Sequence, residues 1–184
     1  MRGTVVVRKN RKGVPNAARD RSAALKQLRR DVKQLRRLAK AKVPKNTIRA
    51  GNDSGSLVNF ALYPKRITVK AGQRVTFTMS KRSTESHTAT FGPKAYLQTL
   101  SEQFQGPAGI NAQTAYPSEP PPAPFTLAGA SQHGSGYFNT GVLDTDKATK
   151  QIPAKAAVTF STAGSYDFIC LIHPNMKGPV VVEP

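Results

Sequence analysis

The spacing of hydrophobic residues divides the chain into two parts, the first of which predicts a helix. Residues 16–42 contain neither glycine nor proline, and apolar side chains recur there at spacings of three and four. This period is typical of an amphipathic α-helix with one narrow apolar stripe. Pro44 then ends the helix, because the residue before a proline is biased out of the helical region. The stripe consists of Leu25, Leu28, Val32, Leu35 and Ala39.

After Gly51 the hydrophobic period shortens to two, and β-branched residues become frequent. This alternation, interrupted by turn sequences such as Ala71-Gly72 and Ala163-Gly164, predicts short β-strands. A series of short strands with turns between them predicts an all-β fold, an antiparallel β-sandwich. The predicted strands cover residues 57–62, 67–70, 74–79, 87–91, 157–161, 165–169 and 180–182.

Between Gly92 and Pro153 the alternation weakens, and the chain becomes rich in Pro, Gly, Ser and Gln. We expect a long loop insertion at about residues 92–135. Loops of this length inside a compact domain are usually functional or mobile.

Charge reinforces the division of the chain. The 184 residues carry a formal net charge of +18, with 28 Lys or Arg against 10 Asp or Glu. Of these, residues 1–50 hold 17 basic and two acidic residues, whereas residues 51–184 hold 11 basic and eight acidic residues.

The length of the chain suits one domain with appendages. No run of about 20 apolar residues is present, which excludes a membrane-spanning helix of the usual kind.

The basic helix has several possible partners for its stripe and its charge. One interpretation is a solvated linker whose stripe packs on the sandwich or self-associates. Another is binding through residues 16–42 to an anionic membrane or cell-wall surface, which Lys and Arg on an amphipathic helix favour. Nucleic acid is the least favoured partner, because neither interleaved aromatic residues nor a known groove-reading motif accompanies the charge.

The candidate chemistry lies near the C-terminus, where Cys170, His173 and Met176 fall within seven residues. A thiolate, an imidazole and a thioether form a ligand set that suits copper in both oxidation states. A lone cysteine is more often a small buried hydrophobe, but its neighbours here favour a metal site. A fourth ligand must come from elsewhere, and His87 at the start of a predicted strand is favoured over His133 in the insertion.

These residues carry a resemblance to a known family. His87, followed by Cys170-x-x-His173-x-x-Met176 after an aromatic strand, resembles the cupredoxins, the plastocyanin/amicyanin-like family. The resemblance covers about residues 55–91 and 136–184, on either side of the insertion. It implies a Greek-key β-sandwich that binds one type-1 (blue) copper ion. In this arrangement His87, Cys170 and His173 are strong ligands and Met176 is the weak axial one.

Two positions depart from the family's pattern. Many cupredoxins have Asn directly after the first histidine ligand, where its side chain braces the ligand loop, whereas this chain has Thr88. Whether the ligand loop is braced in the same way therefore depends on whether the Thr88 hydroxyl can replace the Asn side-chain amide. Relatives also often have Pro before the second histidine, whereas Ile172 retains a backbone N–H that can reach the cysteine sulfur.

The resemblance implies one-electron transfer to transient redox protein partners, with His173 as the route for the electron. The apolar collar around His173 would consist of Leu171, Ile172, Pro174 and Met176. The chain itself is not expected to be an enzyme, because catalytic copper sites need further histidines and only three are present. Two alternatives stay open: a copper-binding or delivery module without a redox partner, and an electron-feeding domain of a larger copper enzyme. The family implies an extracytoplasmic setting, secreted, periplasmic or at the cell surface, although no secretory signal opens this chain.

The two ends of the chain also resemble each other, since residues 1–7 (MRGTVVV) and 176–182 (MKGPVVV) agree at five of seven positions. The match suggests that residues 1–8 are the last strand of a truncated, preceding cupredoxin-like domain. Residues 9–50 would then form a basic helical linker, and residues 51–184 the copper domain.

Overall fold

The computed structural model describes residues 7, 16–54, 57–107, 109–118, 132–133, 137–149 and 151–184. The chain divides into two units, Met1–Arg36 and Arg37–Pro184. Apart from Val7, the strand expected at residues 1–8 lies outside the described residues.

Helix α1 (Ala17–Leu38) occupies most of the first unit's described residues. Asn16 caps it, because its side-chain oxygen accepts a hydrogen bond from the Arg19 backbone N–H at 2.9 Å. None of the helix residues is buried. The side chains of Leu25, Leu28 and Val32 are 48%, 57% and 39% exposed. Among the described residues, no helix is both long and apolar enough to cross a membrane.

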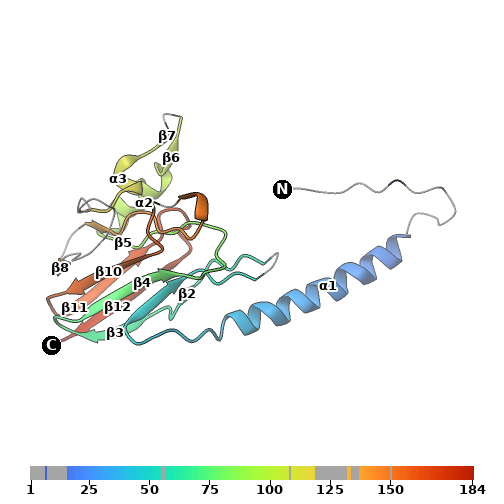
Figure 1. The fold of residues 1–184 in the computed structure, drawn as a ribbon, viewed down its shortest axis with the longest axis horizontal. Coiled ribbons are helices and arrows are strands. Elements are labelled where there is room, and N and C mark those ends of the chain that lie inside the picture. The colour runs from blue at the N-terminus through green and yellow to red at the C-terminus, as the bar shows by residue number, and fades with distance from the viewer. Residues whose placement is uncertain are drawn as a thin grey trace. The chain divides into compact units, whose positions relative to one another are not determined.

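The second unit contains two five-stranded sheets (Figure 1). The first sheet has the order β2 (Leu62–Tyr63), β1 (Thr47–Ala50), β4 (Arg74–Met79), β10 (Lys155–Phe160), β8 (Gln132–His133). The second has the order β3 (Ile67–Lys70), β12 (Lys177–Glu183), β11 (Gly164–Ile169), β5 (Thr90–Phe91), β9 (Phe138–Asn139).

Neither sheet is purely antiparallel, which corrects the expected strand pairing. Strands β1 and β4, β10 and β8, and β12 and β3 pair in parallel. The remaining pairs within the two sheets are antiparallel. A period of two identifies strands without distinguishing these pairings.

The predicted strands at 67–70 and 74–79 coincide with β3 and β4. Strand β1 was not predicted, and it pairs with β2 and β4, so the sheet begins four residues before the boundary expected at Gly51. The predicted strand 57–62 survives only at its last residue, in β2. The segment 87–91 is a strand only in β5, while His87 forms an isolated bridge with Leu143.

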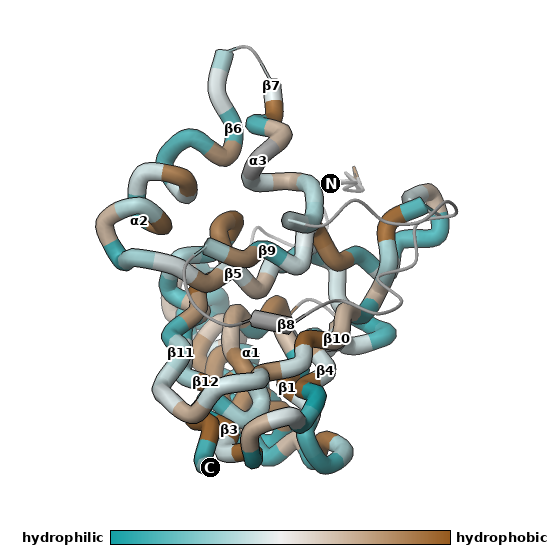
Figure 2. Tube along the Cα trace, turned by 90° about the vertical axis from the view of Figure 1, so that its left-hand side faces the viewer, coloured by the Kyte–Doolittle hydropathy of each residue, from teal (hydrophilic) through white to brown (hydrophobic). Residues whose placement is uncertain are grey.

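The insertion is more ordered than the expected loop. It contains helix α2 (Lys94–Glu102), the hairpin β6 (Gln105–Gly106) and β7 (Gly109–Ile110), and the short helix α3 (Ala112–Ala115). Helix α2 begins after Pro93 and buries Leu97 and Leu100, which are three residues apart on one face. A short 3₁₀ helix, η1 (Lys147–Thr149), precedes β10. Figures 1 and 2 place α2, α3 and the hairpin at one end of the sheets.

The core is aromatic at its centre. The Phe91 ring contacts the rings of Phe77, Phe160 and Phe168 at centroid distances of 5.8, 5.6 and 5.3 Å. Alternate residues of β4, β10 and β12 are buried, as the period of two predicts. Each fully buried large side chain contributes about 1.5–3 kcal/mol. Figure 2 shows hydrophobic positions within these strands.

Candidate metal centre

The fold brings three of the predicted ligands together. The ligand atoms of His87, Cys170 and His173 all lie within 4.8 Å of one another. Cys170 directly follows β11, and His173 lies in the turn between β11 and β12. His87 comes from a distant part of the sequence. Its backbone N–H donates to the Leu143 carbonyl at 3.0 Å, and its carbonyl accepts from the Leu143 N–H at 2.7 Å.

The β11–β12 turn is closed by its own backbone. Ile169 pairs with Lys177 at the base of the turn. The Cys170 N–H donates to the Met176 carbonyl at 2.9 Å, and the Met176 N–H donates to the His173 carbonyl at 2.8 Å. The spacing of three residues between successive candidate ligands therefore corresponds to a tight loop with internal hydrogen bonds.

The three ligand atoms form a nearly isosceles triangle. The Cys170 sulfur lies 3.8 Å from Nδ1 of His87 and 3.8 Å from Nδ1 of His173. The two Nδ1 atoms are 3.2 Å apart. A point equidistant from the three atoms lies about 2.1 Å from each, which compares with about 2.0–2.1 Å for nitrogen and about 2.3 Å for thiolate ligands of zinc, the neighbour of copper.

The electrostatics of the site also suit a cation. Burial, and then the charge of His173, lower the pKa of His87 from 6.5 to about 4. Burial also lowers the pKa of His173. Both imidazoles are therefore neutral near pH 7 and keep a lone pair for a metal. Burial raises the pKa of the Cys170 thiol, while backbone N–H groups oppose this effect, so metal binding would release a proton here.

Met176 lies in the same turn, with 1% of its surface exposed, and belongs to the hydrophobic core. Its burial and its place in the loop are compatible with the expected axial position. Leu171 is equally buried at 1%, so neither residue forms part of an exposed collar around His173.

His133 lies in β8, where its backbone pairs with Phe160 of β10. Among the described His, Cys, Asp and Glu side chains, those of His87 and His173 form a group with the Cys170 sulfur.

A hydroxyl does replace the amide that braces the loop in many relatives. Thr88 Oγ1 accepts a hydrogen bond from the Leu171 N–H at 2.8 Å. The Thr88 backbone N–H donates to the Cys170 sulfur at 3.3 Å. One residue thus holds both the sulfur and the start of the ligand loop.

The Thr88 hydroxyl begins a buried network that sequence analysis missed. It lies 3.0 Å from the Thr90 hydroxyl, which donates to Oδ1 of Asn139 at 2.8 Å. Since the Thr90 proton goes to Asn139, Thr88 is the donor to Thr90. The Asn139 amide donates to the carbonyls of Thr114 and Tyr116 at 2.9 and 3.1 Å. Polar residues at buried strand positions are the only signal in the sequence for this network.

Two further residues border the site and were not anticipated. The Phe60 ring lies 4.4 Å from the His173 ring, centroid to centroid, and is 48% exposed. Asp53 is 4% exposed, and its carboxylate accepts hydrogen bonds from the backbone N–H groups of Asn59 and Thr84 at 2.8 and 3.0 Å. Asp53 therefore ties the segment before Phe60 to the segment before His87.

Comparison with known proteins finds a partial similarity. No family model matches the chain. Over 49 residues the chain is 41% identical to amicyanin from Paracoccus versutus, a match that covers 25% of this chain and 37% of the relative. The chain thus matches little more than a third of that protein's length. The match supports the resemblance to the cupredoxins.

Solved structures give further similarities. The chain is similar to oxidized plastocyanin from Dryopteris crassirhizoma, with 23% identity and a TM-score of 0.41, covering 74% of this chain and 99% of that one. It is also similar to a mutant amicyanin in its Cu(I) form, with 18% identity and a TM-score of 0.40, covering 79% and 89%.

Proposed function

We propose that this chain is a blue copper protein that transfers single electrons. The observation that carries the proposal is the triangle formed by the Cys170 sulfur and the two histidine Nδ1 atoms, whose centre lies at metal-ligand distance from all three. In the proposed site His87, Cys170 and His173 are the strong ligands and Met176 is the weak axial ligand. Copper bound there would supply a Cu(II)/Cu(I) couple.

In the proposed site, the protein fixes the positions of the ligands and shields them from water. His87, Cys170 and Met176 are at most 1% exposed, so water is excluded from most of the site. The Leu143 backbone fixes His87, and Thr88 fixes the sulfur. Ligands held by packing and hydrogen bonds change position little between oxidation states, which favours fast transfer.

His173 is the partly exposed ligand and the proposed route for the electron. On either side of it, Ile172 is partly buried and Pro174 is exposed, and Phe60 packs against its ring. These apolar groups would contact a transient redox protein partner. Interfaces of this kind are small, with less than about 1,200 Å² buried.

Burial of the site also separates electron transfer from copper delivery. A delivery module must release its metal to a partner, and exchange requires access to the ligands. Three of the four proposed ligands, His87, Cys170 and Met176, are at most 1% exposed, which favours retention of the metal. This geometry therefore favours electron transfer over delivery, whereas an electron-feeding domain of a larger copper enzyme would use the same site.

The first test is copper titration followed by visible and electron paramagnetic resonance spectroscopy. We expect one copper ion per chain, an intense thiolate-to-copper absorption and a small copper hyperfine splitting. The His87→Ala variant should lose these signals, and His133→Ala should keep them. A colourless copper-loaded protein, or loss of colour only in His133→Ala, would refute the proposed site.

A second proposal concerns the partner of helix α1. We propose that α1 binds an anionic surface, such as a membrane or cell wall, in an extracytoplasmic setting. Its apolar residues Leu25, Leu28 and Val32 are exposed beside Lys and Arg side chains, which suits binding in the plane of a negatively charged surface. The full chain should sediment with phosphatidylglycerol vesicles at low salt and remain in solution with phosphatidylcholine vesicles. Equal sedimentation with both, or none with either, would contradict this proposal.

A further inference from the structure

Helix α2, which belongs to the insertion, contacts the ligand loop directly. The Ser101 hydroxyl, near the end of α2, donates to the Leu171 carbonyl at 2.8 Å. Leu171 follows Cys170 and is 1% exposed. Its N–H donates to Thr88 Oγ1, also at 2.8 Å. The backbone of Leu171 is therefore held on one side by Thr88, in the segment that leads into β5, and on the other by the insertion.

The bond from Ser101 acts on a particular peptide group. The Leu171 carbonyl and the Ile172 N–H belong to the same planar unit, so fixing one end fixes the direction of the other. The Ile172 N–H lies two residues after Cys170, the spacing at which a backbone N–H in a turn can reach the side chain that begins the turn. A hydrogen bond accepted by the carbonyl also polarises the peptide and strengthens its N–H as a donor.

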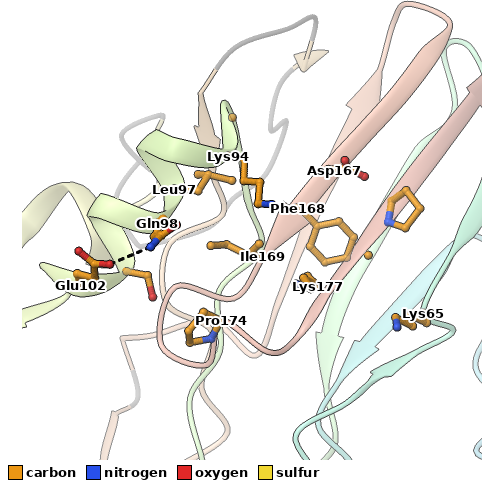
Figure 3. A pocket seen from close by; sticks show the side chains of 14 residues that line it. Lys65, Lys94, Leu97, Gln98, Glu102, Asp167, Phe168, Ile169, Pro174 and Lys177 are labelled. Atoms are coloured by element: carbon orange, nitrogen blue, oxygen red, sulfur yellow. Dashed lines mark hydrogen bonds between the residues drawn. The ribbon is translucent and has the colours of Figure 1, made fainter.

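The position of Ser101 is set by apolar anchors on the same helix. Leu97 and Leu100 are 3% and 2% exposed. A pocket of about 710 Å³ opens between α2 and the β11–β12 hairpin, and Ser101 and Pro174 are among the residues that line it. Figure 3 shows Leu97 and Ile169 between the helix and β11, with Pro174 of the ligand loop at the pocket's edge. Because this pocket separates part of α2 from the β11–β12 hairpin, the Ser101 hydrogen bond is a localised connection between the insertion and the ligand loop.

We propose that Ser101 is a positioning residue for the metal centre, which acts through the Leu171–Ile172 peptide to aim an N–H at the Cys170 sulfur. This inference rests on the proposed copper function. An N–H directed at the sulfur withdraws negative charge from the thiolate, which stabilises Cu(I) relative to Cu(II) and raises the reduction potential. The insertion thus helps to set the potential of the site from outside the ligand loop.

The test compares variants that differ in this one hydroxyl. Ser101→Ala removes it, while Thr99→Ala removes a hydroxyl from the same helix that donates only to the Ala95 carbonyl, at 3.2 Å. We expect Ser101→Ala to shift the Cu(II)/Cu(I) equilibrium about threefold toward Cu(II), the size of one modest hydrogen bond. Thr99→Ala should leave the equilibrium unchanged. Redox titration against a mediator of known potential measures both.

A pair of equally shaped variants separates hydrogen bonding from packing. Ser101→Thr retains a hydroxyl, whereas Ser101→Val has nearly the same volume without one. We expect the Thr variant to keep the wild-type potential and the Val variant to match Ser101→Ala. If Ser101→Ala does not fold, this pair of variants still tests whether the Ser101 hydroxyl sets the reduction potential.

A measurement on the metal-free full-length protein is independent of copper. Without the Ser101 bond, the Ile172 amide should exchange with solvent deuterium several times faster in Ser101→Ala and Ser101→Val than in wild type or Thr99→Ala. Unchanged exchange and an unchanged potential in the variants without the hydroxyl would overturn the inference while leaving a blue copper function intact. A wild-type protein that gives no blue copper signal would instead refute the proposed function. The exchange rates of the Ile172 amide would still test whether the Ser101 hydrogen bond holds this peptide.

Discussion

The two histidines of the candidate site are held in different ways. His87 is 1% exposed, and its backbone forms two hydrogen bonds with Leu143. His173 lies in a turn, is only partly buried, and packs against the half-exposed ring of Phe60. Under the proposed function, this difference would divide the roles, so that the His87 side sets the geometry of the metal and the His173 side gives access to a partner.

Removal of each imidazole tests this division most strongly. His87→Ala should abolish blue copper binding and also destabilise the fold by about 2–4 kcal/mol, because it leaves a buried cavity. His173→Gly should also lose the blue signal, but added imidazole should restore it by entering from solvent. Visible absorption with and without imidazole measures both variants. Restoration of His87→Ala and failure with His173→Gly would reverse the assignment of roles.

The buried network behind Thr88 should have the next largest effect. Asn139→Ala leaves the Thr90 hydroxyl and the carbonyls of Thr114 and Tyr116 without their partner. We expect a loss of about 3 kcal/mol in the free energy of unfolding, measured by urea denaturation of the metal-free protein. Gln98→Ala on the exposed face of α2 is the control and should change this value by less than about 0.5 kcal/mol. Equal effects would show that the network does not support the site.

Ile172→Pro removes the backbone N–H that we expect to donate to the Cys170 sulfur. The variant should have a lower reduction potential, by the equivalent of about 1 kcal/mol, because Cu(I) loses a hydrogen bond to its thiolate. Ile172→Val keeps the N–H and serves as the control. An unchanged or higher potential in the proline variant would contradict a role for this donor.

Phe60→Ala should have the smallest effect on the fold. The ring is 48% exposed, so we expect a loss of less than about 1 kcal/mol in the free energy of unfolding. The variant should nevertheless lose copper to a chelator several times faster, because His173 gains access to solvent. Its electron paramagnetic resonance spectrum should match that of wild type. A changed spectrum with unchanged metal loss would place Phe60 among the residues that set the geometry.

The sequence predicted what depends on local pattern. Cys170, His173 and Met176 lie in one short turn, so their spacing alone indicated a common site. The strands at 67–70 and 74–79 alternate regularly and coincide with β3 and β4. No local pattern relates His87 to Cys170, 83 positions away, so His87 was chosen over His133 by its place in a predicted strand, and the family resemblance supported the choice.

What the sequence did not predict depends on tertiary contacts. Strand β1 has four residues and follows a basic segment, so its pattern is too short to recognise. Helix α2 buries only two leucines, which gave no clear helical period within a polar insertion. The roles of Ser101 and Asn139 come from backbone carbonyls of distant segments, and such acceptors leave no mark in the side-chain sequence.

The most direct test of the account is X-ray absorption spectroscopy at the copper edge of the metal-loaded full chain. The account predicts two nitrogen ligands and one short sulfur ligand in wild type, with one nitrogen lost in His87→Ala and the sulfur lost in Cys170→Ser. A copper environment made only of nitrogen and oxygen in wild type would contradict it.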